Sequence, residues 1–200
     1  MNIIYLDEYR DLLGCMFSIA HEYCYSLGAL ERSISYSAFF KDLENSMTLN
    51  PIITDKALAK QLFPELEIDL FKVSSYNQCL WAAECYLRIQ HETKFPFELI
   101  FLYIPIEEMY RYFNIYHEMD FSQMVDLFNS KYKEHSVFAI LLSKYKFSVK
   151  EVSVKTGIPY ETLISLKQRK RDISKVNVKT VIKIARFFHV SIETLSETSY

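Results

Sequence analysis

Four basic side chains fall within five positions late in the chain. They are Lys167, Arg169, Lys170 and Arg171. Lysine and arginine side chains neutralise phosphate groups, so this cluster predicts contact with the backbone of a nucleic acid. Charge clusters are also common on solvated surfaces that bind nothing. The prediction therefore depends on the elements that surround the cluster.

A second group of residues early in the chain has side chains that can bind a metal. His21 and Cys24 lie one helical turn apart, and Cys15 is nearby. They lack the close Cys-x-x-Cys pairs of structural zinc sites. Cys79 and Cys85 fall on different faces of a helix, so they do not share a site. We therefore expect free, reduced thiols, no metal and no other cofactor.

A histidine close to two carboxylates is the nearest approach to an acid–base site. His117 is followed by Glu118 and Asp120. General acid–base catalysis needs such groups to converge in a pocket, and a His–Glu pair at a helix end is more often a surface feature. The chain also lacks a glycine-rich loop for phosphate binding. We expect no enzymatic activity, although an enzyme in the first 135 residues stays an alternative.

The net charge changes sign along the chain. Residues 136–200 contain twelve Lys and Arg against five Asp and Glu, a net charge of +7, whereas residues 1–135 contain eleven against twenty, a net charge of −9. A basic segment fits a polyanionic partner, but an acidic one repels DNA and must do something else. The polar stretch 131–136 separates the two, so we expect domains at 1–135 and 136–200.

A helix-turn-helix pattern precedes the basic cluster. Ser153 is small, as required where two crossing helices touch, and Gly157 follows four residues later, where the chain must turn sharply. Pro159 opens the second helix, where its missing N–H is harmless. The expected core between the two helices consists of Val152, Ile158, Leu163 and Leu166.

This pattern resembles the Cro and phage-repressor helix-turn-helix family, often called the XRE type. The resemblance covers about residues 136–196. Ser136–Lys146 matches the first helix of the family, Val178–Phe188 the fourth and Val190–Leu195 the fifth. The resemblance implies a five-helix domain that binds double-stranded DNA.

In this family the second helix of the motif enters the major groove. The resemblance, together with helical spacing, implies that the base-reading residues are Tyr160, Glu161, Ile164, Ser165 and Gln168. It implies phosphate contacts for the basic cluster, Lys167, Arg169, Lys170 and Arg171.

The chain departs from the family at two places. Val149 stands where the family commonly has a glutamine that touches phosphate, which weakens one contact with the DNA backbone. Lys167 and Arg169 replace a glutamate and a glycine just after the recognition helix. The second change adds positive charge and partly offsets the first.

The remainder of the chain also predicts helices. With only three glycines in 200 residues, few tight hairpins can form. Apolar residues recur at helical spacing in the segments Asp7–Leu27, Ser35–Leu43, Asp55–Phe63, Ser75–His91, Ile106–Tyr116 and Asp120–Tyr132. The apolar run Phe97–Tyr103 suits a buried strand or a helix, its flanks favour a helix, and Pro105 must break whatever element runs there. We expect an all-α fold with a helical N-terminal domain and a five-helix repressor-like domain.

The sequence predicts neither an N-terminal signal segment nor a membrane span. The first residues turn acidic by Asp7, unlike a signal peptide, and the apolar run Leu99–Ile106 is too short to span a bilayer. We therefore expect a cytoplasmic protein that does not enter membranes. The sequence favours a DNA-binding transcriptional repressor, of phage or toxin–antitoxin type, that acts as a homodimer. The alternative is an inhibitor or antitoxin whose N-terminal domain binds a protein target, with DNA binding for autoregulation.

Overall fold

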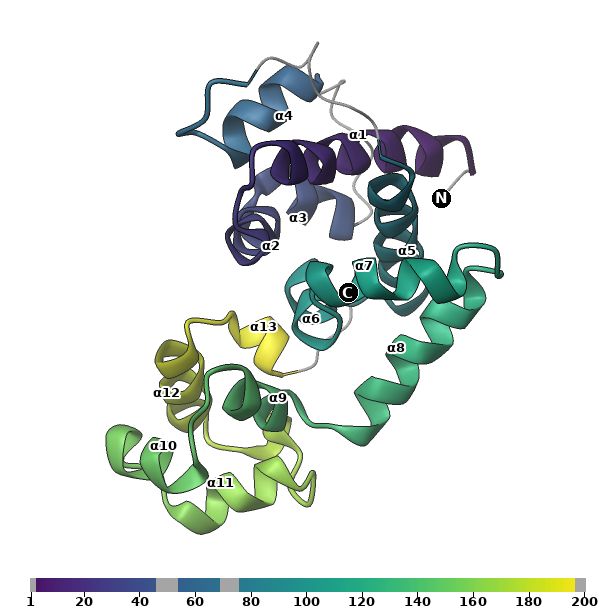
Figure 1. The fold of residues 1–200 in the computed structure, drawn as a ribbon. Helices are drawn as coiled ribbons and strands as arrows, with labels where there is room; N and C mark the ends of the chain where they lie inside the picture. The colour runs from purple at the N-terminus through teal and green to yellow at the C-terminus, as the bar shows by residue number, and fades with distance from the viewer. Residues whose placement is uncertain (1–2, 46–53, 69–75, 197–200) are drawn as a thin grey trace. The chain divides into compact units, whose positions relative to one another are not determined.

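All regular secondary structure in the computed structural model is helical. The structure describes residues 3–45, 54–68 and 76–196, and these ranges contain thirteen α-helices, one short 3₁₀ helix and no strand (Figure 1). The predicted all-α fold is confirmed.

The contacts divide the chain into two compact units. The first is residues 1–127 together with residue 200, and the second is residues 128–199. The division falls within helix α8, Ser122–Glu134, whereas the change in net charge follows the end of that helix.

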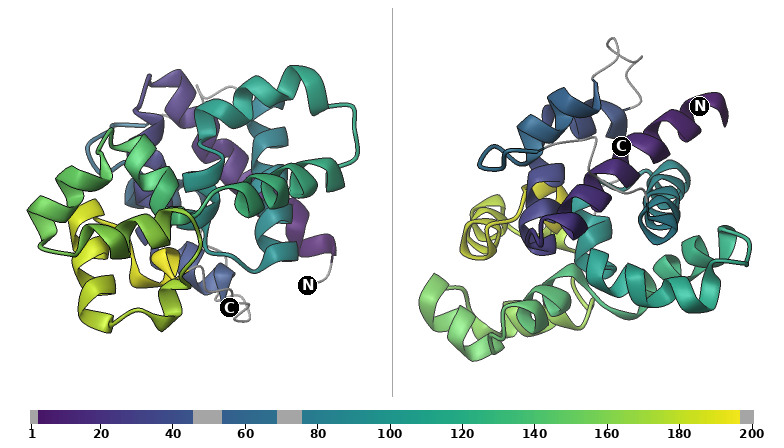
Figure 2. Two further views of the ribbon diagram at one scale, coloured as in Figure 1. Left: turned by 90° about the horizontal axis from the view of Figure 1, so that it is seen from below. Right: turned by 45° about the horizontal axis from the view of Figure 1, so that its top comes forward.

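Seven helices precede α8 in the first unit. They are α1 (Ile3–Glu22), α2 (Leu27–Tyr36), α3 (Ala38–Glu44), α4 (Asp55–Leu62), α5 (Asn77–Thr93), α6 (Phe97–Tyr103) and α7 (Ile106–Tyr116). Helix α1 packs against α5 (Figure 2). Gly14 permits this contact, because a Cβ there would lie 2.6 Å from Leu80 Cδ2 and 3.2 Å from Leu80 Cα. One of the three glycines therefore serves helix packing and not a turn.

Aromatic rings connect the helices of the first unit. Tyr86 of α5 lies between Phe17 of α1 and Phe101 of α6, with ring centroids 5.9 Å and 4.8 Å away. Phe97 continues the series to Phe40 of α3 at 5.5 Å. All five side chains are buried, so the high aromatic content of the chain forms a core here.

The segment from Asp7 to Leu27 is predicted as one helix, but the structure divides it. Helix α1 ends at Glu22, and Cys24 adopts left-handed backbone with φ 49°. Ser26 then caps α2, where its Oγ accepts a hydrogen bond from the backbone N–H of Ala29 at 3.3 Å. A capping serine competes with helix continuation, which the apolar spacing alone does not reveal.

The predicted helix Ser35–Leu43 is divided in the same way. Ser37 has extended backbone, with φ −68° and ψ 130°, and separates α2 from α3. Ser75, the predicted start of a later helix, lies outside the described residues, and α5 is described from Asn77.

The apolar run that suited either a strand or a helix forms α6, and Pro105 separates it from α7. Buried carboxylates bind the first N–H group of both helices. Glu44 Oε1 accepts from Phe97 N at 2.6 Å, and Glu31 Oε1 accepts from Ile106 N at 2.8 Å. Two distant glutamates therefore take the capping role that serine or aspartate usually has.

The second unit contains the end of α8 and five further α-helices. These are α9 (Val137–Lys144), α10 (Val149–Thr156), α11 (Tyr160–Lys167), α12 (Val178–Phe188) and α13 (Ile192–Leu195), with the 3₁₀ helix Ile173–Lys175 before α12. The residues expected to fill the core of the motif are all buried, namely Val152, Ile158, Leu163 and Leu166.

Candidate nucleic-acid interface

Helix α10 begins with a reciprocal pair of hydrogen bonds. Ser148 Oγ accepts from Glu151 N at 3.2 Å, and Glu151 Oε2 accepts from Ser148 N at 2.7 Å. This capping box satisfies two N–H groups that the helix itself leaves unpaired. The hydrogen bonds from Ser148 lower the pKa of Glu151, so the carboxylate stays ionised as the cap requires.

The turn between α10 and α11 has the geometry that its glycine predicts. Gly157 has φ +67° and donates its N–H to Ser153 O at 2.9 Å. Ser153 also donates its hydroxyl across the turn to Ile158 O at 2.7 Å. The sequence pattern accounts for Ser153 only by its small size and does not predict this hydrogen bond across the turn.

The predicted base-reading residues do not all have the same exposure. Tyr160, Glu161 and Gln168 are exposed, and Ile164 and Ser165 are partly buried. Ser165 Oγ donates to Glu161 O at 2.8 Å, so its proton is used within the helix. Helix α11 ends at Lys167, and Gln168 is its C-cap. The outer face of α11 therefore presents one phenol, one carboxylate and one carboxamide to solvent.

The chain leaves α11 through a left-handed residue. Arg169 has φ +52°, its N–H donates to Leu166 O at 3.1 Å, and Lys170 N donates to Ser165 O at 2.9 Å. This is the Schellman arrangement, in which glycine usually holds the left-handed position. Here Arg169 holds the left-handed position, where the Cro and phage-repressor family has glycine.

The four cations of the basic cluster are exposed but are not equivalent. The guanidinium carbon of Arg169 lies 4.9 Å from the ring centroid of Tyr132 in α8, and Arg169 Nη1 donates to Lys133 O at 3.5 Å. Lys167, Lys170 and Arg171 have no such contact with α8 among the described interactions. Arg169 is therefore held against α8, which the sequence did not predict.

Ser136 connects the start of α9 to the end of α11. Its Oγ accepts from Ala139 N at 3.1 Å and donates to Lys167 O at 3.0 Å. The backbone at the first residue of the basic cluster is thus fixed, which gives the cluster a defined position beside the outer face of α11.

Helix α12 adds positive charge that the sequence prediction did not include. Lys179, Lys183 and Arg186 are exposed and recur at helical spacing along the helix. The Nζ of Lys183 would lie 3.9 Å from a Cβ at Gly157, so this lysine extends toward the turn of the motif. The helical spacing of these three residues in the sequence could have identified them. The family resemblance, however, implies phosphate contacts only for the segment after α11.

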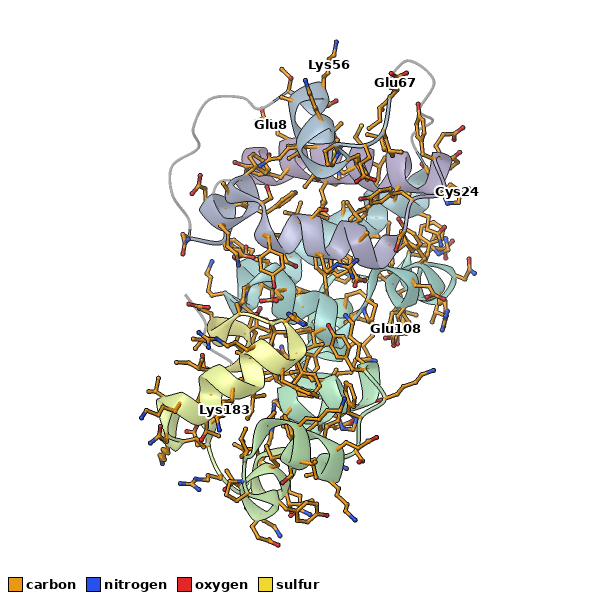
Figure 3. The ribbon with its side chains drawn as sticks, turned by 90° about the vertical axis from the view of Figure 1, so that its left-hand side faces the viewer. Glu8, Cys24, Lys56, Glu67, Glu108 and Lys183 are labelled. Atoms are coloured by element: carbon orange, nitrogen blue, oxygen red, sulfur yellow. The ribbon has the colours of Figure 1, made fainter. Side chains whose placement is uncertain are left out.

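The cysteines of the first unit are separate thiols. Cys79 and Cys85 are buried, Cys15 is partly buried and Cys24 is exposed (Figure 3). Burial raises the pKa of Cys79 and brings the pKa of Cys15 to about 11, so both thiols are protonated at neutral pH. Among the described residues, no three His, Cys, Asp or Glu side chains are arranged to hold a metal ion.

His117 lies on the surface at the end of α7. Its ring stacks on Phe113 with centroids 4.6 Å apart, its Nδ1 is 2.8 Å from Phe113 O, and its Nε2 is 3.7 Å from Glu118 Oε1. This arrangement places the histidine against its own helix. In the described part of the chain, no helix has the length and apolar character needed to cross a membrane.

Comparison with protein-family models found no match to this chain, and comparisons with curated proteins and with solved structures found none either. The function proposed below therefore rests on the geometry of the second unit.

Proposed function

We propose that the protein is a sequence-specific DNA-binding regulator that acts as a repressor. One observation carries the proposal: the exposed polar face of α11 is directly followed by four exposed cations, and a hydrogen bond from Ser136 fixes the backbone at the first of them. A polar helix face beside concentrated positive charge suits a major groove bordered by phosphates.

The base-reading part of the proposal rests on the three exposed side chains of α11. The carboxamide of Gln168 can form two hydrogen bonds with adenine, and the carboxylate of Glu161 can accept from the amino group of cytosine. Tyr160 is 47 % exposed and can contact a base edge or a phosphate through its hydroxyl. Ile164 and Ser165 lie deeper and define the shape of the face.

Phosphate contacts provide affinity that does not depend on sequence. Lys167, Lys170 and Arg171 are exposed at the end of α11, where they can reach the strands on either side of the groove. Arg169 is held by Tyr132, so it offers a pre-positioned guanidinium rather than a mobile one. Each neutralised phosphate releases counterions, so binding must weaken as salt rises.

The test is a titration of the purified full chain against duplexes selected from a random pool and against unselected duplexes. We expect tighter binding to the selected duplexes, and affinity for both classes that falls steeply with salt concentration. A protein that shows no salt-dependent affinity for any duplex contradicts the proposal.

A second function is favoured by the charge of the N-terminal part of the chain. Residues 1–135 have a net charge of −9, which opposes DNA binding by that part of the chain. We propose that this part binds a protein partner or a second copy of the chain. In the antitoxin alternative, that partner is the regulated protein, and DNA binding controls synthesis of the pair.

A further inference from the structure

Two lysines lie beside the turn that leads into α11. The Nζ of Lys183 in α12, a helix that contacts α10 (Figure 1), is 3.9 Å from the position of a Cβ at Gly157, the glycine of this turn. Lys155 is in the last turn of α10 and comes two residues before the same glycine. The basic cluster, by contrast, begins at Lys167, the last residue of α11. Positive charge therefore lies at both ends of α11.

The ammonium group of Lys155 is held against an aromatic ring. Its Nζ lies 5.3 Å from the ring centroid of Phe147, and Phe147 packs on Phe187 of α12 with the two centroids 5.1 Å apart. Through Phe147, Lys155 is connected to the helix that carries Lys183. A cation held over a ring keeps its charge and loses less freedom when it binds an anion.

The charge of both lysines is accessible from solvent. Both residues are exposed, and neither forms an ion pair within the described part of the chain. Glu151 lies one helical turn before Lys155, but its Oε2 accepts a hydrogen bond from Ser148 N at 2.7 Å in the capping box. The two ammonium groups can therefore bind an external anion.

The length of α11 matches the width of the groove that it is proposed to enter. At a rise of roughly 1.5 Å per residue, its eight residues span about 12 Å. The major groove of B-DNA is also about 12 Å wide, and a phosphate strand borders it on each side. Cations at the two ends of a helix of this length can therefore reach both strands.

We propose that Lys155 and Lys183 bind phosphates of one DNA strand while the basic cluster binds phosphates of the other strand, so that α11 is clamped in the groove from both ends. This inference rests on the proposed function and adds the contacts with the second strand. The two lysines also compensate for Val149, which stands where the Cro and phage-repressor family commonly has a phosphate-contacting glutamine. Since phosphate contacts do not depend on the base, the lysines provide affinity and orientation but no sequence preference.

The first test compares the wild type with the double variant Lys155→Gln, Lys183→Gln on the selected duplex at several salt concentrations. The slope of log affinity against log salt should fall by about two, because each lost phosphate contact removes about 0.9. The preference for the selected duplex over random duplexes should not change. The matched control is Lys56→Gln, Lys60→Gln, which removes the same charge from exposed side chains of α4 and should leave the slope unchanged.

Ethylation interference on the selected duplex shows which strand each group contacts, since an ethylated phosphate has no charge. In the wild type, ethylation should weaken binding at phosphates of both strands within one half-site. The double variant should lose this sensitivity on one strand only, and Lys170→Gln should lose it on the other. Loss of sensitivity on the same strand in both variants rejects the clamp.

Amide hydrogen exchange of α10 and α12 shows whether the double variant keeps its fold. The single variant Lys183→Gln leaves the contact of Lys155 with Phe147 intact and should lower the salt slope by about one. If the wild type binds the selected duplex and these substitutions do not change the slope, the clamp is wrong and the proposed function stands. If the wild type binds no duplex, both are rejected.

Discussion

Gly157 and Arg169 follow α10 and α11 with left-handed backbone, but only the first of them is a glycine. An L-residue with a Cβ pays about 1–2 kcal/mol for this conformation. At Arg169 the contacts with Tyr132 and Lys133 offset part of that cost. At Gly157 a Cβ would make only an ordinary van der Waals contact with Lys183 Nζ at 3.9 Å, so the backbone conformation determines the effect of a substitution there.

We predict that Gly157→Ala destabilises the second unit by about 1–2 kcal/mol. Amide hydrogen exchange of α10 and α11 in the full chain measures this unit separately from the first. The matched control is Gly28→Ala in α2, where a Cβ would also make only an ordinary van der Waals contact and the backbone is helical. Gly28→Ala should stabilise the first unit by about 0.5–1 kcal/mol. Equal effects of the two substitutions would contradict the backbone argument.

Variants of Gln168 and Lys170 test the proposed division between base reading and phosphate binding. We predict that Gln168→Ala costs about 1–3 kcal/mol on the selected duplex and relaxes the preference at one base pair. Lys170→Gln should weaken binding to every duplex alike and reduce the slope of log affinity against log salt by about one. Titrations at several salt concentrations measure both. If Gln168→Ala weakens selected and random duplexes equally, α11 does not read bases through this residue.

At the scale of elements, two helices of the first unit depend on buried carboxylates from elsewhere in the chain. Glu44 binds the start of α6 and also pairs with Lys41, whose Nζ is 3.0 Å from Glu44 Oε2. Burial nevertheless raises the pKa of Glu44, because the loss of hydration outweighs the hydrogen bond from Phe97 and the charge of Lys41. The ionised cap therefore costs some stability at neutral pH.

The sign of the resulting pH dependence follows from proton binding. Above the ordinary glutamate pKa, the unfolded chain releases a proton that the folded chain retains until its own raised pKa is passed. The contribution of Glu44 to stability is therefore fully present at low pH and is lost as the pH rises through the folded-state pKa. We predict that the free energy of unfolding of the wild type, relative to Glu44→Gln, increases as the pH falls from 8 to 5.

Urea unfolding followed by the fluorescence of Trp81 measures this prediction. Trp81 is the only tryptophan in the chain and is buried in the first unit. Ser35→Ala is a suitable control, since it removes the buried hydrogen bond from Ser35 Oγ to Glu31 O without removing an ionisable group. Its difference from the wild type should not vary over this pH range. Parallel pH profiles for wild type and Glu44→Gln would show that Glu44 does not titrate in this way.

Local patterns in the sequence predict the positions of helices better than their ends. Helical spacing located α7 and the buried face of α11, because both depend on residues within one or two turns. The cap at Phe97 could not be predicted, since its partner Glu44 lies 53 positions away. The contact of Arg169 with α8 was missed for the same reason, because Lys133 lies 36 positions earlier. The sequence could predict which segment forms the candidate site. It could not predict that Arg169, unlike the other three cations, contacts α8.

At the scale of the whole molecule, positive and negative charge are divided between two parts of the chain. The segment 136–200 has a net charge of +7 and contains the proposed interface, whereas residues 1–135 have a net charge of −9. Under the proposed function, one part of the chain attracts DNA and the other part repels it. A single recognition helix reads few base pairs, so one chain gains little affinity to overcome this repulsion. Two chains on one site double the contacts, and this favours a dimer as the DNA-bound form.

We predict that two chains bind one palindromic duplex whose half-sites are about 34 Å apart, one turn of DNA. We expect the first unit to supply the contact between the chains, because residues 1–135 have a net negative charge that DNA repels. Sedimentation velocity of the full chain with the selected duplex should give two chains per duplex, and a duplex with one half-site should bind far more weakly. Insertion of five base pairs between the half-sites should abolish the cooperative complex, because it turns one half-site to the opposite face of the DNA. A chain that remains monomeric both free and on the selected duplex would contradict the dimer and would leave α11 to act alone.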